Sequence, residues 1–342
     1  MRTSQKSRIW QPDALNKTHP VYDERRLPAM AICEMRGVVK HYKQVTALNK
    51  FDMEVREGEI LGLLGPNGSG KTTAINCLLG LLKYDGGEIT VLDQAPASRD
   101  PGLKRRIGLV PSDLAYFEEL SVIDNISYFA GLYETNKREQ KRMTGYAVDF
   151  AGLGKYRKFP AKKLSGGLKR RLNIACGIVH SPEFLVLDEP TLALDAQSRK
   201  YVLNGVRELN RQGTTVLYTT HYLEEAQELC DRIVIIDEGH NMATGTLPEL
   251  IGLIDAEESV HIELPCGEKE AELLERVRSL DGVVDLFAHN GRVTVKLAPP
   301  GHHLAALIES LRLWDIAYST ISSELPTLNE VFLSLTGKAL RE

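Results

Sequence analysis

Nine consecutive residues decide the fold of this chain: Gly65-Pro66-Asn67-Gly68-Ser69-Gly70-Lys71-Thr72-Thr73. They fit the spacing G-x-x-x-x-G-K-[ST]. The short apolar run Ile60–Leu64 precedes them, and a helical pattern from Thr72 to Leu82 follows. We therefore expect a strand, a tight turn and a helix N-terminus in succession. This order predicts a phosphate-binding loop.

The chemistry of the loop suits a nucleoside triphosphate with Mg²⁺. Glycines at 65, 68 and 70 let the backbone turn its N–H groups toward phosphate oxygens, and the helix N-terminus adds a favourable dipole. Lys71 supplies a positive charge for the β- and γ-phosphates, and the Thr72 hydroxyl is an oxygen ligand for Mg²⁺. A chance glycine-rich turn would fit the same pattern, but the flanking strand and helix argue against it.

The composition limits the classes of protein that fit. The 342 residues are enough for one large domain and a smaller one. With 42 Lys and Arg against 46 Asp and Glu, the formal charge of −4 lacks the basic excess of nucleic-acid binders, and we expect no nucleic-acid partner. The five cysteines have no metal-ligand spacing, which is typical of buried thiols in a reducing compartment. No stretch approaches the ~18 consecutive apolar residues that cross a bilayer, so we expect a cytoplasmic protein.

Short apolar strands alternate with helices in residues 29–254, which predicts an α/β nucleotide-binding domain with a parallel sheet covered on both faces. The expected strands of this sheet are Ile60–Leu64, Ile107–Val110, Phe184–Leu187, Thr214–Thr219 and Ile233–Ile236. An antiparallel edge sheet is expected from Ala31–Met35, Ala47–Val55 and Glu88–Leu92. Residues 113–172 are expected to form a mostly helical insertion. Residues 1–28 are polar and rich in proline, which predicts a disordered arm.

The pattern changes beyond residue 255. Strands and helices are expected in the order β-α-β-β-α-β at Val260–Glu263, Glu268–Leu280, Val283–Ala288, Arg292–Leu297, Leu304–Leu313 and Ile316–Ile321, before a closing helix Leu328–Leu335. The turn Asn290-Gly291 favours a hairpin between two of these strands. Residues 255–342 are therefore predicted to form a small ferredoxin-like accessory or regulatory module. His302-His303 at a helix start fits a solvated cap better than a metal site.

The apolar strand Leu185-Val186-Leu187 ends in Asp188-Glu189-Pro190. If this strand lies beside the strand of the phosphate loop, both carboxylates reach the phosphates. Asp188 would then hold Mg²⁺, and Glu189 would orient and deprotonate the attacking water. The pair predicts hydrolysis at the γ-phosphate. Solvated acids at an exposed strand end are the alternative for the pair taken by itself.

A second candidate anion site lies in Leu164-Ser165-Gly166-Gly167-Leu168. Ser165 is a favourable N-cap, and the free N–H groups and bare glycine backbone behind it can bind an anion. One nucleotide needs only one phosphate loop, so we interpret this site as serving a nucleotide held by another protomer. Ser-Gly-Gly also caps ordinary helices, which leaves a purely structural role open.

Together these motifs resemble the ATP-binding cassette (ABC) family. Over about residues 30 to 250 they occur in the family's order: GPNGSGKTT, LSGGLKRR, LVLDEP, LALD and TTH. The resemblance implies a P-loop NTPase core with a RecA-like parallel sheet, and two cassettes paired head to tail around two ATP molecules. Tyr42 matches the aromatic residue that stacks on adenine, Asp195 the acid that crosses the dimer interface, and His221 the histidine that contacts the γ-phosphate.

With the resemblance, the candidate site contains three groups of residues. The catalytic candidates are Lys71, Glu189 and His221. The nucleotide-binding candidates are Tyr42, Gly65, Pro66, Asn67, Gly68, Ser69, Gly70, Lys71, Thr72, Thr73, Ser165, Gly166, Gly167 and Asp195. The Mg²⁺ candidates are Thr72 and Asp188, with Ser112 at the position where the family has a further polar group.

Ser112 is the main departure from the family, which usually has glutamine after the strand that ends here. The shorter serine side chain cannot reach as far, so hydrolysis would be slower or a water would bridge the gap. Leu168 in place of glutamine and Ala193 in place of glycine are milder departures.

The C-terminal module and its ending, Thr327-Leu328-Asn329-Glu330-Val331-Phe332-Leu333-Ser334-Leu335-Thr336-Gly337, resemble the ATPase subunits of exporters for drugs, antibiotics and Nod factors. In that group the permease is a separate polypeptide. The expected partners are thus an integral membrane permease and a second cassette, in a homodimer or a heterodimer. The protein would lie on the inner face of the cell membrane, attached through the permease.

Two other functions stay open. One is a soluble ABC ATPase without a permease, acting on ribosomes or DNA, although such proteins usually carry two cassettes or long coiled-coil insertions. The other is a catalytically weakened cassette of a heterodimer, which Ser112 favours.

Overall fold

The computed structural model describes residues 30–96, 100–254, 258–265, 270–289, 291–298, 303–324 and 326–338. The chain divides into two units, Met1–Met30 and Ala31–Glu342. The predicted arm (residues 1–28), Asn290 and His302 lie outside the described residues. All helices and strands of the described residues belong to the second unit.

A six-stranded sheet forms the centre of the large domain. Its strand order is β5 (Ile107–Val110), β6 (Phe184–Asp188), β7 (Thr215–Thr220), β3 (Ile60–Leu64), β8 (Arg232–Asp237) and β9 (His240–Gly245). The first five strands are parallel and agree with the predicted bounds within one residue, whereas β9 is antiparallel to β8. Strand β9 was not predicted, because it alternates exposed and half-buried residues at the sheet edge and contains no apolar run.

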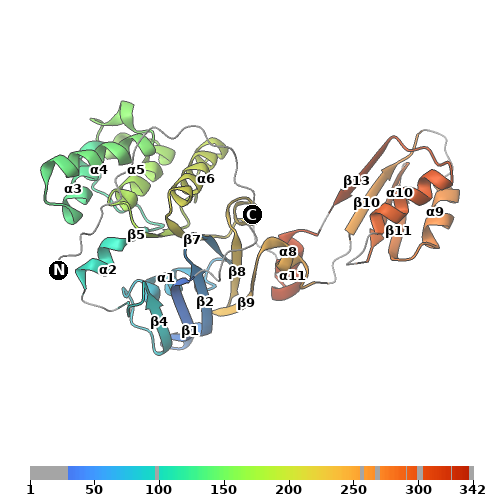
Figure 1. Ribbon diagram of the computed structural model, residues 1–342, viewed down its shortest axis with the longest axis horizontal. Coiled ribbons are helices and arrows are strands. Elements are labelled where there is room, and N and C mark those ends of the chain that lie inside the picture. Colours follow the sequence, from blue (N-terminus) through green and yellow to red (C-terminus); the bar gives the residue numbers. More distant parts are fainter. Residues whose placement is uncertain are drawn as a thin grey trace, which may run out of the picture. The chain divides into compact units, whose positions relative to one another are not determined.

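The predicted antiparallel sheet is present beside this central sheet. Its order is β2 (Val45–Arg56), β1 (Ala31–Tyr42) and β4 (Gly86–Val91). Its inward side chains form one hydrophobic cluster with helix α1 (Lys71–Leu78) and with one face of the central sheet. Figure 1 shows β1, β2 and β4 on one side of the central sheet and α5 and α6 on the other.

Helices α5 (Gly166–Ile178) and α6 (Ala196–Arg211) cover the second face of the central sheet. Ile174 of α5 and Val206 of α6 belong to the same buried cluster as Leu187 of β6. Every residue of β3, β6 and β7 is buried. The prediction of a parallel sheet covered on both faces is thus confirmed, since only a sheet packed on both sides hides all side chains of its strands.

The segment between β5 and β6 is helical, as predicted. It contains α3 (Val122–Tyr133), α4 (Lys137–Phe150), the short 3₁₀ helices Gly154–Tyr156 and Ala161–Lys163, and α5; α2 (Pro101–Arg106) precedes β5. Ile126, Val148 and Leu172 lie in a buried cluster that joins α3, α4 and α5. Helices α3, α4 and α5 therefore form a lobe with an apolar centre of its own. The N-terminus of α5 is exposed at the surface of this lobe.

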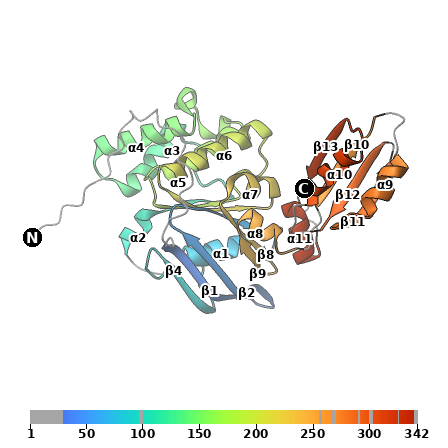
Figure 2. The ribbon, with the colours of Figure 1, turned by 45° about the vertical axis from the view of Figure 1, so that its right-hand side comes forward.

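Three helices pack against β3 and β8 at the opposite end of the domain: α7 (Leu223–Leu229), α8 (Leu247–Ile251) and α11 (Leu328–Thr336). Leu328, Val331 and Phe332 of α11 are fully buried in the cluster that contains Leu64 and Ile235. Helices α8 and α11 lie side by side in Figure 2. The sequence boundary at residue 255 assigned α11 to the small module, whereas its packing places it on the large domain. An apolar helix face in the sequence does not name the surface that covers it.

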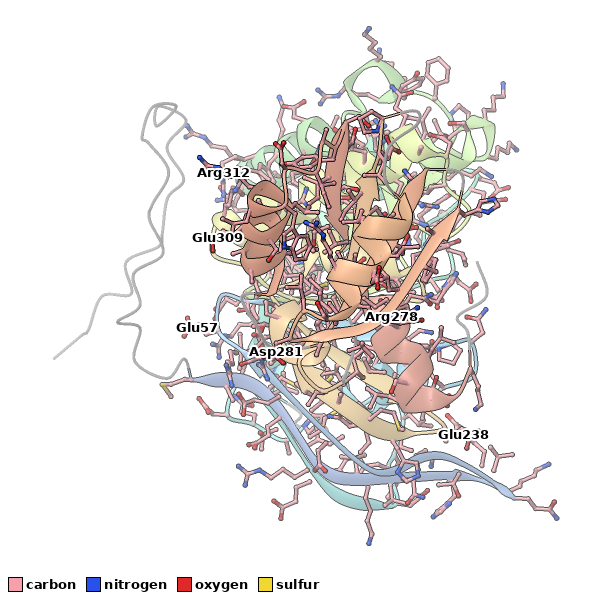
Figure 3. All side chains as sticks on the ribbon, turned by 90° about the vertical axis from the view of Figure 1, so that its right-hand side faces the viewer. Glu57, Glu238, Arg278, Asp281, Glu309 and Arg312 are labelled. Carbon is pink, nitrogen blue, oxygen red and sulfur yellow. The ribbon has the colours of Figure 1, made fainter. Side chains whose placement is uncertain are left out.

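Lys338 adds a polar contact just beyond α11. Its Nζ lies 3.0 Å from Oδ2 of Asp237, the last residue of β8, and 2.7 Å from Oε1 of Glu238, in the turn between β8 and β9. Glu238 is labelled in Figure 3.

The small module contains β10 (Glu258–Glu263), α9 (Glu270–Arg278), β11 (Val283–His289), β12 (Arg292–Leu297), α10 (His303–Leu313) and β13 (Thr320–Glu324), in the predicted order. Its sheet has the order β11-β12-β10-β13, and all neighbours are antiparallel. Leu307 and Leu311 of α10 are buried in its hydrophobic cluster, whereas Glu309 and Arg312, labelled in Figure 3, are exposed. The last strand begins at Thr320 instead of Ile316, because Ile316 is buried against the end of α10, where its N–H bonds to Leu311 O.

No helix among the described residues is long and apolar enough to cross a membrane. The four described cysteines, Cys33, Cys77, Cys176 and Cys230, are free. Burial raises the pKa of the Cys77 thiol to about 11 and raises the pKa of the other three further. These thiols are therefore protonated and unreactive at neutral pH.

Candidate functional site

The phosphate loop joins β3 to α1 through two glycines in the left-handed region. Gly68 has φ 84° and Gly70, the N-cap of α1, has φ 111°. A Cβ at Gly70 would lie 2.5 Å from Ala47 O, and a Cβ at Gly65 would lie 2.2 Å from Ile236 O. The loop is thus held between the backbones of β2 and β8, at distances that only glycine allows.

Lys71 is the first residue of α1 and is 5% exposed. Its Nζ donates to Gly65 O at 2.7 Å and to Pro66 O at 3.1 Å, and it lies 3.2 Å from Oε1 of Glu189. Burial lowers the pKa of Lys71, and the negative charge of Glu189 opposes this shift. The ammonium is therefore held at the mouth of the loop by backbone carbonyls and one catalytic candidate.

Asp188, the last residue of β6, is 3% exposed and is held from two sides. The Thr72 hydroxyl donates to its Oδ2 at 3.1 Å, and the Thr219 hydroxyl donates to its Oδ1 at 2.7 Å. From the sequence, β6 was expected to lie beside β3, but β7 lies between them. Asp188 still reaches the phosphate loop, because the hydrogen bond from Thr72 is direct, and Thr219 holds the acid from the intervening strand.

Glu189 follows with a left-handed backbone, at φ 46°. Its N–H donates to the Thr219 hydroxyl at 2.9 Å. Its side chain lies between two other candidates, with Oε1 3.2 Å from Lys71 Nζ and Oε2 3.3 Å from His221 Nδ1. The structure therefore brings the three catalytic candidates together at one edge of the sheet. A backbone held in a sparsely populated conformation is a common property of functional sites.

The residues around this edge fit Mg²⁺ and a triphosphate. The Thr72 hydroxyl and the Asp188 carboxylate are oxygen donors of the kind that Mg²⁺ prefers, and such sites usually use only one or two protein ligands. The described residues contain no cluster of three or more His, Cys, Asp or Glu that could hold a metal by itself. The Ser69 hydroxyl in the loop is buried and lacks a hydrogen-bond partner among the described residues. A bound phosphate oxygen would satisfy such a group.

The second candidate anion site is at the N-terminus of α5. Ser165 is the N-cap, and its hydroxyl accepts from Leu168 N at 3.4 Å. Gly166 has open space around its missing Cβ, whereas a Cβ at Gly167 would lie 2.4 Å from Ser198 Oγ. Within the parts of the chain that the structure describes, no hydrogen bond or ion pair joins this segment to the phosphate loop. One chain therefore carries two separate candidate anion sites.

Ser198 connects the α5 N-terminus to Asp195, the N-cap of α6. Asp195 accepts from Ser198 N at 2.8 Å and from Ser198 Oγ at 3.1 Å, and these hydrogen bonds lower the pKa of the Asp195 carboxyl. Sequence reasoning missed Ser198, although its position three residues after an N-cap acid is a capping signal.

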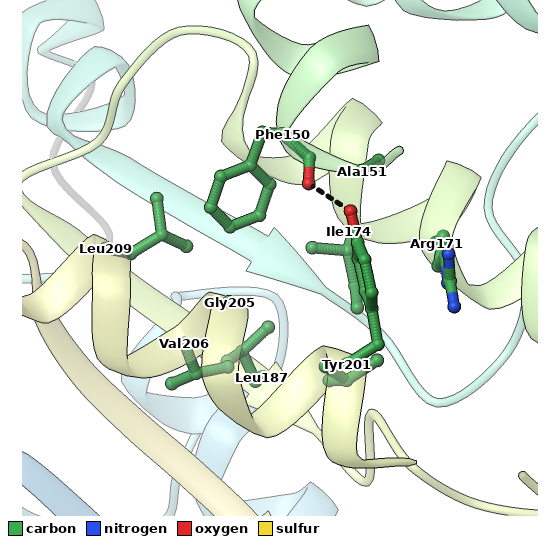
Figure 4. A pocket seen from close by; sticks show the side chains of 10 residues that line it. Phe150, Ala151, Arg171, Ile174, Leu187, Tyr201, Gly205, Val206 and Leu209 are labelled. Atoms are coloured by element: carbon green, nitrogen blue, oxygen red, sulfur yellow. Dashed lines mark hydrogen bonds between the residues drawn. The ribbon is translucent and has the colours of Figure 1, made fainter. Parts of the chain in front are cut away.

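A small cavity in Figure 4 marks where α4, α5 and α6 meet. Tyr201 of α6 donates to Phe150 O at 2.8 Å, and its ring centre lies 3.6 Å from Cζ of Arg171 on α5. The cavity has a volume of about 10 Å³ and apolar walls, so it holds no ligand. These contacts join the helices that begin at Ser165 and at Asp195.

Tyr42 and Ser112 lie outside the central group. Tyr42 ends β1, is 46% exposed, and has Lys40 Nζ 5.6 Å from its ring centre. Ser112 follows β5, and its carbonyl accepts from Arg170 Nη1 at 2.7 Å. Burial lowers the pKa of Arg170, which lies on α5. The segment at Ser112 is thereby tied to the helix of the second anion site, a contact that the sequence did not indicate.

Comparisons with known proteins identify the family and the fold that this chain resembles. The ABC transporter family model matches residues 48–192. The chain is 34% identical over 311 residues to the linearmycin resistance ATP-binding protein LnrL of Bacillus subtilis (strain 168), covering 90% of this chain and 99% of that protein. It is 37% identical over 226 residues to the Nod factor export ATP-binding protein I of Cupriavidus pinatubonensis, covering 66% of this chain and 70% of that protein. The solved ATP-binding subunit of an ABC transporter is similar with a TM-score of 0.60 and 26% identity, covering 65% of this chain and 92% of that chain. The predicted α/β fold is confirmed.

Replacement of Gly65 by alanine should weaken nucleotide binding. A Cβ would lie 2.2 Å from Ile236 O, so the loop must shift away from β8 and its N–H groups must turn from the phosphates. We expect the dissociation constant of a fluorescent ADP analogue to rise at least about tenfold, equivalent to ~1.4 kcal/mol. Gly145→Ala is the control, because its added Cβ meets nothing within 4 Å. An unchanged affinity in folded Gly65→Ala would contradict the clamped loop.

Proposed function

The chain belongs to the ABC transporter family and is an ATPase of that family; on that premise, we propose that it is the ATP-hydrolysing subunit of an exporter whose permease is a separate polypeptide. The names of its relatives support the exporter class, since they refer to linearmycin resistance and to Nod factor export. The match to LnrL covers 99% of that protein, so the small module has a counterpart there.

One observation carries the proposed chemistry: Glu189 lies between Lys71 and His221, and Asp188 beside it contacts Thr72. This arrangement places a candidate base, Glu189, between the Lys71 ammonium and the His221 ring at the end of the phosphate loop. Such an arrangement suits attack of water on a γ-phosphate.

The protein groups would divide the work as follows. The phosphates would be bound by the loop Gly65–Thr73, which includes Lys71. The metal ion would be held by Thr72 and Asp188. When bound, Mg²⁺ neutralises the charge that develops on the phosphate oxygens. Glu189 orients the attacking water and accepts its proton, and His221 contacts the γ-phosphate. Tyr42 stacks on the adenine.

The second anion site supports a head-to-tail dimer. Ser165, Gly166 and Gly167 offer free N–H groups at a helix N-terminus and have no phosphate loop bonded to them within the described residues. In the dimer they would contact the ATP held by the other cassette, with Asp195 crossing the interface. A homodimer is the simplest arrangement, because one chain carries both halves of the site.

The protein lies at the inner face of the membrane through its permease, without contact to nucleic acid. The small module of β10 to β13 then acts in regulation or docking, because the described groups that suit ATP chemistry lie in the large domain.

A weakened cassette in a heterodimer is the second candidate. It is favoured by Ser112, whose carbonyl is bonded to Arg170 while its side chain is too short to replace glutamine. A water between Ser112 and the metal site would restore activity, and turnover by the purified chain separates the two cases.

Replacement of Glu189 by glutamine should abolish turnover and leave ATP binding intact. The amide keeps the shape of the side chain but cannot accept the proton from water. We expect kcat to fall by about 10²–10⁴-fold in a phosphate-release assay. Glu224→Gln is the matched control, because Glu224 is exposed on α7.

Turnover of the parent chain is the reference for this comparison. A parent rate no higher than that of Glu189→Gln would favour the weakened cassette. A Glu189→Gln rate close to the parent rate would contradict the role of Glu189 as the base.

ATP should drive dimer formation when hydrolysis is blocked. In the Glu189→Gln background with Mg-ATP, we expect sedimentation analysis to give twice the mass of one chain, because ATP bound only at the interface stabilises the dimer. Adding Ser165→Arg should restore the single-chain mass, since the larger side chain fills the second anion site. Thr135→Arg adds the same side chain at an exposed position and should leave the dimer intact. A single-chain mass in Mg-ATP without Ser165→Arg would contradict the sandwich.

A permease should purify with the protein from membranes. Affinity-tagged chain from detergent-solubilised cells of the native host is expected to carry an integral membrane protein, identified by mass spectrometry. Cells with untagged protein provide the background. Ribosomal proteins or DNA in place of a membrane protein would contradict the exporter and favour the soluble alternative.

A further inference from the structure

Glu225 is a buried carboxylate that none of the steps above uses. It lies on α7, four residues after His221, and is 1% exposed. Removing a charge from water costs several kcal/mol unless hydrogen bonds and an opposite charge compensate for it. The partners of the Glu225 side chain therefore indicate which role offsets the free-energy cost of burying its charge.

Three hydroxyls donate to one oxygen of Glu225. Its Oε2 accepts from Thr191 Oγ1 at 2.8 Å, from Tyr218 Oη at 2.9 Å and from Thr220 Oγ1 at 2.9 Å. Burial raises the pKa of Tyr218 well above its usual value, and the Glu225 charge raises it further, so the phenol stays a donor. All three donors are nearly fully buried.

Two of these donors adjoin the catalytic candidates. Thr191 follows Glu189 by two residues, and Thr220 directly precedes His221. The Thr220 hydroxyl also accepts from Tyr222 N at 3.0 Å. This hydrogen bond joins the two residues that flank His221. Movement of Glu225 would therefore reach the backbone that carries His221 and the backbone just after Glu189.

The second oxygen of Glu225 faces α6. Its Oε1 lies 3.3 Å from Nε of Arg199, four residues after Asp195, and this ion pair lies outside hydrogen-bond geometry. The guanidinium of Arg199 lies 4.7 Å from the ring centre of Tyr222, directly after His221. The ion pair thus adds the start of α6 to the segments that meet at Glu225.

We infer that Glu225 is a positioning residue for ATP hydrolysis, which keeps His221, Glu189 and the Asp195 end of α6 in register by binding Thr220, Thr191 and Arg199. Among the described residues, its side chain has no hydrogen bond or ion pair with Lys71, Glu189 or His221, and it acts through these three neighbours. The inference rests on the roles proposed above for Glu189 and His221. It also explains why a charge is buried here, since an apolar residue of similar size would fill the space without orienting three hydroxyls.

The test compares Glu225→Gln with Glu224→Gln, its exposed neighbour on α7. The amide keeps the size of the side chain, but its charge is lost and one end presents a donor to Arg199 or to the hydroxyls. Small displacements of catalytic groups are costly, up to ~10²-fold per ångström. We expect kcat of Glu225→Gln to fall at least about tenfold, with the dissociation constant of Mg-ADP within about threefold of the parent. Glu224→Gln should match the parent in both.

A purely structural role would give a different result. In that case the melting temperature would fall, while kcat of the remaining folded protein would stay within about twofold of the parent. That outcome would overturn the inference. If Glu225→Gln does not fold, Thr220→Val serves in its place, because it removes one of the three hydroxyls with little change in size.

A double-mutant cycle tests the route of action. If Glu225 acts in part through His221, the loss of kcat caused by Glu225→Gln should be smaller in the His221→Ala background than in the parent chain. Multiplied losses would show that Glu225 does not act through His221 and would contradict the inference. Glu189→Gln separates this result from the proposed function: an inactive Glu189→Gln with a fully active Glu225→Gln removes only the positioning role.

Discussion

The candidate site depends on the hydroxyl of Thr219, which holds the two acids at the end of β6 from the neighbouring strand β7. Strand β7 separates β6 from β3, and Asp188 reaches the phosphate loop directly, through the hydroxyl of Thr72. Thr219 donates to Asp188 and accepts from the N–H of Glu189. A nearly buried carboxylate needs such partners. With one face of Asp188 bonded to Thr219, the other is available to Thr72.

The same logic extends outward from this contact. Glu189 is held in a left-handed backbone and lies between Lys71 and His221. Glu225 repeats the arrangement one layer away, with buried hydroxyls gathered on one carboxylate oxygen. Hydrogen-bonded polar groups in an interior of low dielectric hold side chains more firmly than apolar packing does. The candidate site therefore contains two hydroxyl-bonded acids, Asp188 at the end of β6 and Glu225 on α7.

The parts of the chain away from this edge are joined by packing and by a few polar contacts. Arg171 of α5 stacks on Tyr201 of α6, and Ser198 lies against Gly167, so the second anion site and Asp195 are neighbours. At the other end, α11 buries Phe332 beneath β8, although nearly a hundred residues separate the two in sequence. The small module has a hydrophobic cluster made only of its own residues. It therefore has the core of an independent unit, whereas α11 depends on the large domain for burial.

The local signals in the sequence were sufficient for the strands, the phosphate loop and the identity of most candidate residues. Five apolar runs became the five parallel strands within one residue, because strands buried on both faces must be continuously apolar. Glycine at 65 and 70 and the G-K-T sequence define the loop through backbone geometry, which is a local property. The candidate roles of Tyr42, Ser112, Asp195 and His221 came from resemblance, that of Ser165 came from its position at a helix start, and all stay predictions. Strand β9 was not predicted, because an edge strand needs no apolar run. Only the tertiary structure decided the long-range contacts: the order of β6, β7 and β3, the bonding of Thr219 and Thr72 to Asp188, the gathering of Thr191, Tyr218 and Thr220 on Glu225, and the docking of α11. A sequence pattern predicts which face of a helix or strand is buried and which is polar. The element that packs against the buried face depends on the packing of the whole chain.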